Sequence, residues 1–246
     1  MTRHILLMAG LTGLLTLAAG CSAGHDEPSP RPATPNAGPT RVIWLGDSVA
    51  AGQALPLREA LAAAGVEFQS MASDGGGTVV GPVSQELWKT LPDHLATARP
   101  STVIYQITTY DWGSEQEQQA AYRRLAATVT DAGARLIFVT MPPIKPDDFY
   151  RPHMDDLHRA ADAARTVGAG TVVLGADEVW GSTYQQIRNG KADRSSDGIH
   201  TCPQGAARFT SWLLTELTKL YPGFSPPAAA TWANTGWSGD KRFIGC

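Results

Sequence analysis

The sequence predicts an α/β domain built on a doubly wound parallel sheet, and three observations lead to that prediction. Strand-like apolar runs alternate with helical stretches from residue 41 to residue 220. The runs at 103–104, 137–139 and 172–174 are continuously apolar and β-branched, as expected of strands that helices cover on both faces. Strands that alternate with helices in this way usually form parallel sheets.

Each element follows from its local pattern. The expected strands cover residues 41–45, 66–72, 102–107, 135–140 and 171–174. The expected helices between them cover about 49–64, 84–98, 114–132 and 154–167. A last helix begins at Pro203, because proline is favoured at the first helical position. Its apolar residues recur at spacings of three and four, namely Phe209, Trp212, Leu213, Leu217 and Leu220.

The first twenty residues have the pattern of an export signal. Basic Arg3 is followed by the apolar stretch 5–19 and by small residues before Cys21. This arrangement resembles the lipobox of bacterial lipoproteins, although Ala18 stands where those proteins usually have leucine. The resemblance implies removal of residues 1–20 and acylation of Cys21; an ordinary secretory peptide or an uncleaved anchor are the alternatives. In either case we expect an extracytoplasmic protein, membrane-anchored through lipid or secreted.

The rest of the chain divides into a tether and one domain. Residues 21–40 are rich in Pro, Ala, Gly and Ser and predict a disordered tether. Residues 41–246 fit a single domain with a C-terminal tail, 222–246, and we expect a monomer. The net charge of -3 argues against nucleic-acid binding, and no later segment is apolar for long enough to span a bilayer. No metal-site spacing is present, so neither metal nor cofactor is expected.

Two short blocks carry the predicted chemistry. Gly46-Asp47-Ser48 follows the apolar run 42–45 and places a serine at the turn that leaves a buried strand. Asp197 and His200 stand just before the last helix. A serine hydroxyl needs a neighbouring base, so His200 would accept its proton while Asp197 orients the imidazole; the alternative roles are a turn residue and a polar loop residue. Asp47 is expected to accept hydrogen bonds from the start of the following helix.

The two blocks resemble the SGNH or GDSL hydrolases, and the resemblance covers residues 41–221. It implies a flavodoxin-like, three-layer αβα sandwich. It also implies an oxyanion hole made by the backbone of Ser48, a glycine after the second strand and an asparagine after the third. Gly75 is the best-placed glycine of the loop 73–77, and Gly76 is the next. Donors of this kind stabilise the charge that appears in the transition state.

The third block departs from the family pattern. Tyr110 stands at the asparagine position and Thr108 at the position of the family's glycine. The missing donor could be the Tyr110 phenol, Thr108 or Thr109, or the hole could work with two donors. The chain also resembles SGNH domains attached to membrane acyltransferases, in which this block is often degenerate.

Three functions are therefore considered. The first is an exported serine esterase that removes an acyl group, most plausibly acetyl, from a cell-envelope glycan or small ester. The second is an O-acyltransferase to envelope sugars that uses the same triad. The third is a catalytically weak or inactive glycan-binding or scaffold protein.

The tail adds a disulfide prediction. With Cys21 assigned to lipid, Cys202 and Cys246 remain, and one leftover pair in an exported protein favours a disulfide. That bond would tie the last residue to the helix start beside His200. Trp232 and Trp237 would then either line the site or anchor the tail to the core.

Overall fold

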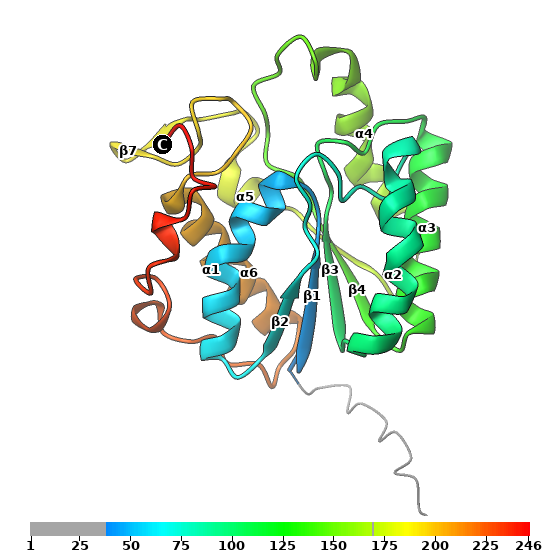
Figure 1. Ribbon diagram of the computed structural model, residues 1–246, viewed down its shortest axis with the longest axis horizontal. Coiled ribbons are helices and arrows are strands. Elements are labelled where there is room, and N and C mark those ends of the chain that lie inside the picture. Colours follow the sequence, from blue (N-terminus) through cyan, green and yellow to red (C-terminus); the bar gives the residue numbers. More distant parts are fainter. Residues whose placement is uncertain (1–37, 169) are drawn as a thin grey trace, which may run out of the picture. The chain divides into compact units, whose positions relative to one another are not determined.

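A computed structural model describes residues 38–168 and 170–246. The predicted signal, Cys21 and nearly all of the predicted tether lie outside the described residues. Five parallel strands form one sheet in the order β2-β1-β3-β4-β5 (Figure 1). The strands are β1 (Arg41–Leu45), β2 (Glu67–Ser70), β3 (Thr102–Gln106), β4 (Arg135–Val139) and β5 (Val172–Leu174). This order confirms the flavodoxin-like sheet, and it opens a crevice at the carboxyl ends of β1 and β3, where the connections diverge.

Helices cover both faces of the sheet, which confirms the three-layer αβα architecture. α1 and α6 lie on one face with the short α5, and α2, α3 and α4 lie on the other (Figure 1). The helices are α1 (Ser48–Ala63), α2 (Gln85–Ala98), α3 (Glu115–Asp131), α4 (Met154–Arg165), α5 (Asp177–Trp180) and α6 (Pro203–Leu220). None of the helices in the described ranges is long and apolar enough to cross a membrane.

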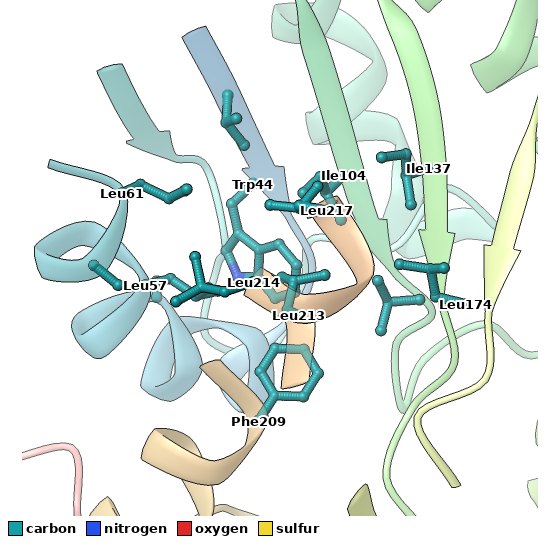
Figure 2. Close-up of a cluster of buried hydrophobic side chains, with 14 of the residues drawn as sticks. Trp44, Leu57, Leu61, Ile104, Ile137, Leu174, Phe209, Leu213, Leu214 and Leu217 are labelled. Carbon is teal, nitrogen blue, oxygen red and sulfur yellow. The ribbon is translucent and has the colours of Figure 1, made fainter. Parts of the chain in front are cut away.

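The central strand β1 buries both of its faces, and this explains its unbroken apolar sequence. Trp44 points toward α1 and α6, where it packs beside Leu57 and Phe209 (Figure 2). Its indole N–H donates to the backbone carbonyl of Ala50 at 2.8 Å, so the polar atom is also satisfied. Leu45 points to the opposite face, into the cluster beneath α2, α3 and α4.

The predicted elements are present, but short ones were missed. The additions are α5, the hairpin β6 (Ile187–Arg188) and β7 (Lys191–Ala192), and four 3₁₀ helices at Pro82–Ser84, Arg151–His153, Ala229–Thr231 and Trp237–Gly239. Elements of two to four residues are too short to show a periodicity. β2 is also shorter than the predicted strand 66–72.

The tail packs against the body and ends in the predicted disulfide. Cys202, at the start of α6, is bonded to Cys246, with their Cα atoms 5.6 Å apart. Trp232 is buried in the same core cluster as Trp44, and Trp237 packs against that cluster. The tryptophans therefore anchor the tail to the core.

Candidate active site

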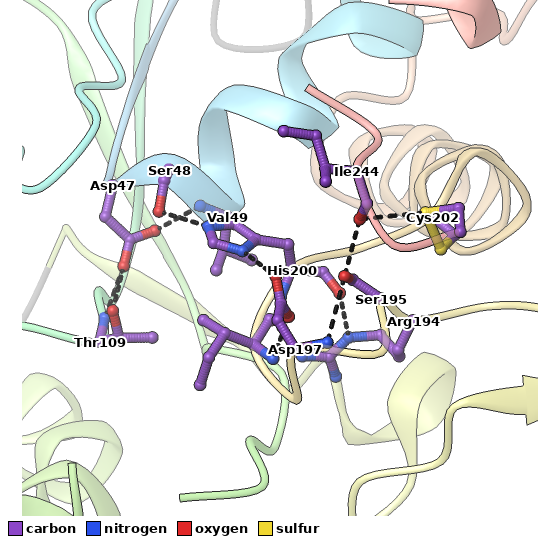
Figure 3. A network of polar contacts seen from close by, with 12 residues as sticks. Asp47, Ser48, Val49, Thr109, Arg194, Ser195, Asp197, His200, Cys202 and Ile244 are labelled. Carbon is purple, nitrogen blue, oxygen red and sulfur yellow. Dashed lines mark hydrogen bonds and ion pairs between the residues drawn. A yellow bond between two sulfur atoms is a disulfide. The ribbon is translucent and has the colours of Figure 1, made fainter. Parts of the chain in front are cut away.

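Asp47 holds the turn that presents Ser48. Its Oδ1 accepts the backbone N–H groups of Val49, at 2.9 Å, and Ala50, at 3.4 Å, which caps α1 as predicted. Its Oδ2 accepts the N–H of Thr109, at 2.7 Å, and the Thr109 hydroxyl, at 2.8 Å (Figure 3). Burial raises the pKa of Asp47, and these hydrogen bonds oppose the rise. The carboxyl thus joins the loops after β1 and β3 and sets Ser48 at the first turn of α1.

Ser48, His200 and Asp197 form a continuous chain of hydrogen bonds (Figure 3). The Ser48 Oγ lies 2.8 Å from His200 Nε2, and His200 Nδ1 lies 2.7 Å from Asp197 Oδ2. A carboxylate can only accept, so the ring proton of a neutral imidazole belongs on Nδ1. Nε2 then accepts from the serine hydroxyl, and this is the direction in which a base must remove the proton.

Asp197 is held as a carboxylate by its own loop. Its Oδ1 accepts the backbone N–H groups of Ile199, at 2.7 Å, and His200, at 3.0 Å. Partial burial favours the neutral form, but these hydrogen bonds and the one from the His200 ring outweigh it and lower the pKa of Asp197. The three-residue spacing therefore works because the carboxylate bonds both the backbone and the ring.

The lowered pKa of Asp197 predicts a difference in acid stability. The unfolded carboxyl titrates near 3.9. Ionised Asp197 therefore stabilises the fold above that pH, and the contribution is lost as the pH falls through the lower folded pKa. We expect the melting temperature of Asp197→Asn to fall less than that of the wild type between about pH 6 and about pH 3. The difference is small, because the side chain is 43% exposed. Thermal unfolding followed by circular dichroism measures it, and an equal or larger drop in the variant would contradict this expectation.

Arg194 is a buried residue of this loop that no sequence motif indicates. Its guanidinium donates to three backbone carbonyls, those of His200 (3.2 Å), Pro143 (2.8 Å) and Ile199 (2.6 Å). Burial lowers the pKa of Arg194 to about 10, so it still carries its charge at neutral pH. Arg194 thus positions the segment that carries His200, and only the contacts reveal this role.

An open pocket of about 580 Å³ lies at the Ser48 hydroxyl. Its lining residues come from four separate parts of the chain: Ser48, Asp74, Gly75, Asp197, His200, Lys241, Arg242 and Ile244. The tail lines the pocket, but with residues 241–244 and not with its tryptophans. The sequence did not indicate these residues, because they carry no motif. They lie at the pocket because the chain just after them is held by the Cys202–Cys246 disulfide.

Two residues of this pocket carry backbone N–H groups that no described protein atom accepts. Gly75 lines it together with Ser48, as the family resemblance implies, whereas Gly76 is not among the lining residues. Within the described part of the chain, the N–H groups of Ser48 and Gly75 donate to no protein acceptor. Ser48 is the first residue of α1, so its N–H lies at the positive end of the helix dipole, which favours a bound anion. Both groups are available to an oxyanion.

The structure does not bring Tyr110 to the pocket. Its ring packs against Trp112, with centroids 5.4 Å apart, and against Phe149 and Tyr150. Thr109 gives both of its donors to Asp47, as described above. The hydroxyl of Thr108 donates to the buried carboxyl of Asp111 at 2.8 Å. Of the considered alternatives, these contacts favour a hole with two donors.

The described residues contain no group of three or more His, Cys, Asp or Glu side chains that could hold a metal ion.

Comparison with solved structures identifies the fold. A Bacteroides ovatus protein described as a GDSL-like lipase superposes with a TM-score of 0.55 at 13% identity, over 78% of this chain and 56% of its own. An α/β hydrolase enzyme from the metagenome of Lake Arreo gives 0.56 at 16%, over 75% and 97%. A Geobacillus acetyl-xylooligosaccharide esterase gives 0.51 at 17%, over 75% and 96%. The chain has the fold of the GDSL-like hydrolases.

The chain spans little more than half the length of the Bacteroides ovatus protein. No protein-family model matches the sequence, and no curated protein sequence matches it.

Proposed function

We propose that this protein is an ester hydrolase of SGNH type that works through an acyl-serine intermediate. The observation that carries the proposal is the hydrogen-bonded chain from Ser48 through His200 to Asp197, which opens on a pocket with two free backbone donors. A protein that only bound glycans would need none of these contacts. The fold shared with GDSL-like lipases supports the same reaction class.

The first half-reaction forms the acyl-enzyme. The Ser48 Oγ attacks the ester carbonyl carbon while its proton passes to His200 Nε2. The carbonyl oxygen becomes an oxyanion, and the N–H groups of Ser48 and Gly75 stabilise it. When this intermediate collapses, the carbon–oxygen bond to the alcohol breaks, and His200 returns the proton to the leaving oxygen. Asp197 stabilises the imidazolium between the two transfers.

The second half-reaction restores the serine. A water molecule gives a proton to His200 Nε2 as its oxygen attacks the acyl carbon. Collapse of the second oxyanion breaks the bond to Ser48 Oγ, which takes the proton back from His200. The products are the free carboxylic acid and the original triad, so no other reactant is needed.

The substrate that we propose is an acyl ester, most plausibly acetyl, of a cell-envelope glycan or of a small molecule. The open pocket of about 580 Å³ supports a substrate whose alcohol part extends beyond the reacting ester. The structural likeness to an acetyl-xylooligosaccharide esterase supports an acetylated carbohydrate in the same way.

We also propose that the protein works outside the cytoplasm, as a monomer held by lipid on Cys21 and a tether over residues 21–40. The sequence pattern before Cys21 supports export. The Cys202–Cys246 disulfide supports an oxidising compartment, because such bonds rarely persist in the cytosol.

Covalent labelling of Ser48 tests the proposed function. We expect a fluorophosphonate to add one label to the wild type, located at Ser48 by mass spectrometry, and we expect hydrolysis of p-nitrophenyl acetate. Ser48→Ala should abolish the label and lower kcat by about 10⁴-fold or more, because the nucleophile is gone. Ser84→Ala is a matched control, since that serine lies outside this pocket. A wild type without label and without turnover would exclude the proposed enzyme.

A further inference from the structure

The last residues of the chain form one wall of the pocket. Three of them line it: Lys241, Arg242 and Ile244. The segment 240–246 is held at its end by the disulfide between Cys246 and Cys202. It is also held by the Ser195 hydroxyl, which donates to the carbonyl of Ile244 at 2.7 Å (Figure 3). These anchors, Ser195 and Cys202, lie on the loop and helix that position His200. The pocket wall is therefore held in place relative to the hydrogen-bonded chain of Ser48, His200 and Asp197.

Charges around the pocket are unevenly neutralised. Arg242 forms an ion pair with Asp74 at 2.6 Å, and the two side chains are 41% and 65% exposed. Exposed ion pairs of this kind are weak, so Asp74 binds the Arg242 guanidinium only weakly. The Asp197 carboxylate accepts the ring N–H of His200 and the backbone N–H groups of Ile199 and His200, so these three donors stabilise its charge. Lys241 forms no ion pair with any described residue, so it is the cation of the lining that has no anionic partner.

We infer that Lys241, beside Arg242, makes this pocket select esters that carry an anionic group, a carboxylate or a phosphate, on the alcohol side of the ester bond. The inference rests on the proposed function. The proposed acyl group is uncharged, so a negative charge must lie on the part of the substrate that leaves. A cation in the pocket wall attracts such a group while the ester carbonyl lies at Ser48.

The overall charge of the protein does not produce such a selection. The chain carries a net charge of -3, which repels anions at long range. A preference for anionic esters must therefore come from the local cations of the wall. It must also weaken as salt is added, because the Debye length falls to about 3 Å at 1 M.

Binding to the Ser48→Ala protein tests the inference without turnover. The probes are 4-acetoxybenzoate and its neutral methyl ester, titrated into the full chain at low salt. We expect the anionic probe to bind about three to ten times more tightly. Adding Lys241→Gln should lower that ratio at least threefold, whereas Lys89→Gln, a control on α2 outside this pocket, should leave it unchanged. Equal binding of the two probes, or a smaller drop with Lys241→Gln, would overturn the inference.

Turnover separates this inference from the proposed function. For the enzyme with Ser48 intact, the ratio of kcat/KM for the two probes should fall with Lys241→Gln and fall further with Lys241→Glu. If the wild type takes no fluorophosphonate label and hydrolyses neither p-nitrophenyl acetate nor these probes, the proposed function fails, and the binding ratio still decides the anion preference. A third probe, 4-acetoxyphenyl phosphate, shows which anionic group the wall prefers.

Discussion

Replacing His200 by alanine is expected to lower kcat for ester hydrolysis by about 10⁴-fold or more. The imidazole is the only group bonded to the Ser48 hydroxyl in the described structure, so no other side chain is placed to take its proton. The loss should appear in kcat and much less in KM, because the base acts in the transition state. Stopped-flow or steady-state hydrolysis of p-nitrophenyl acetate measures both constants.

Two controls make this prediction specific to the relay. His158→Ala alters a histidine of α4 that lines a different pocket, so its kcat should stay near that of the wild type. The double variant Ser48→Ala/His200→Ala should lose no more activity than the larger single loss, because the residues act as one unit. If His200→Ala kept more than about a tenth of the wild-type kcat, another base would have to be found.

Gly77→Ala is expected to lower the free energy of unfolding by about 2–4 kcal/mol. Gly77 has φ +74°, a conformation that costs an alanine about 1 kcal/mol or more. A Cβ here would also lie 1.8 Å from the carbonyl oxygen of Gly46. That oxygen belongs to the backbone just before Asp47 and Ser48, and it cannot rotate away as a side chain could. The loop carrying Gly75 must therefore move away from the nucleophile.

Its neighbours are matched controls for this substitution. At Gly76 an added Cβ would meet Ser73 Oγ at 3.5 Å, an ordinary contact, so Gly76→Ala should be nearly neutral. At Gly75 the φ of +67° is unfavourable but no atom lies within 4 Å, so the cost should be intermediate. Urea unfolding followed by circular dichroism gives the three values. Equal stabilities of Gly77→Ala and Gly76→Ala would show that the close approach to Gly46 is not rigid.

The long elements and the polar blocks could be predicted because their signals are local. The apolar run of β1 and the spacing of Phe209 and Leu213 on α6 can be read within a few residues of the chain. Asp47 could be assigned to the start of α1 for the same reason, since capping involves only neighbouring backbone groups. The short α5 and the β6–β7 hairpin have no comparable signal and were missed.

Other features depend on contacts that a local pattern does not contain. Tyr110 aligns with an oxyanion donor, yet its ring packs with Trp112 because aromatic side chains after β4 fill the space beside it. From the sequence, Trp232 and Trp237 could either line the site or anchor the tail to the core, and the structure shows them as anchors. The tail lines the pocket with Lys241, Arg242 and Ile244, while Trp232 is buried in the core.

By itself the sequence determined the alternation of strands and helices, the approximate extent of the main elements and the candidate relay residues, because hydrophobic period, capping and residue chemistry are local properties. Only the tertiary structure decided which groups share the pocket. Ser48 and His200 are 152 residues apart, and their hydroxyl and imidazole meet because the parallel sheet brings the loops at its carboxyl ends together. The proposed two-donor oxyanion site and the proposed cationic wall likewise depend on packing between distant segments, which the residues of each segment do not encode alone.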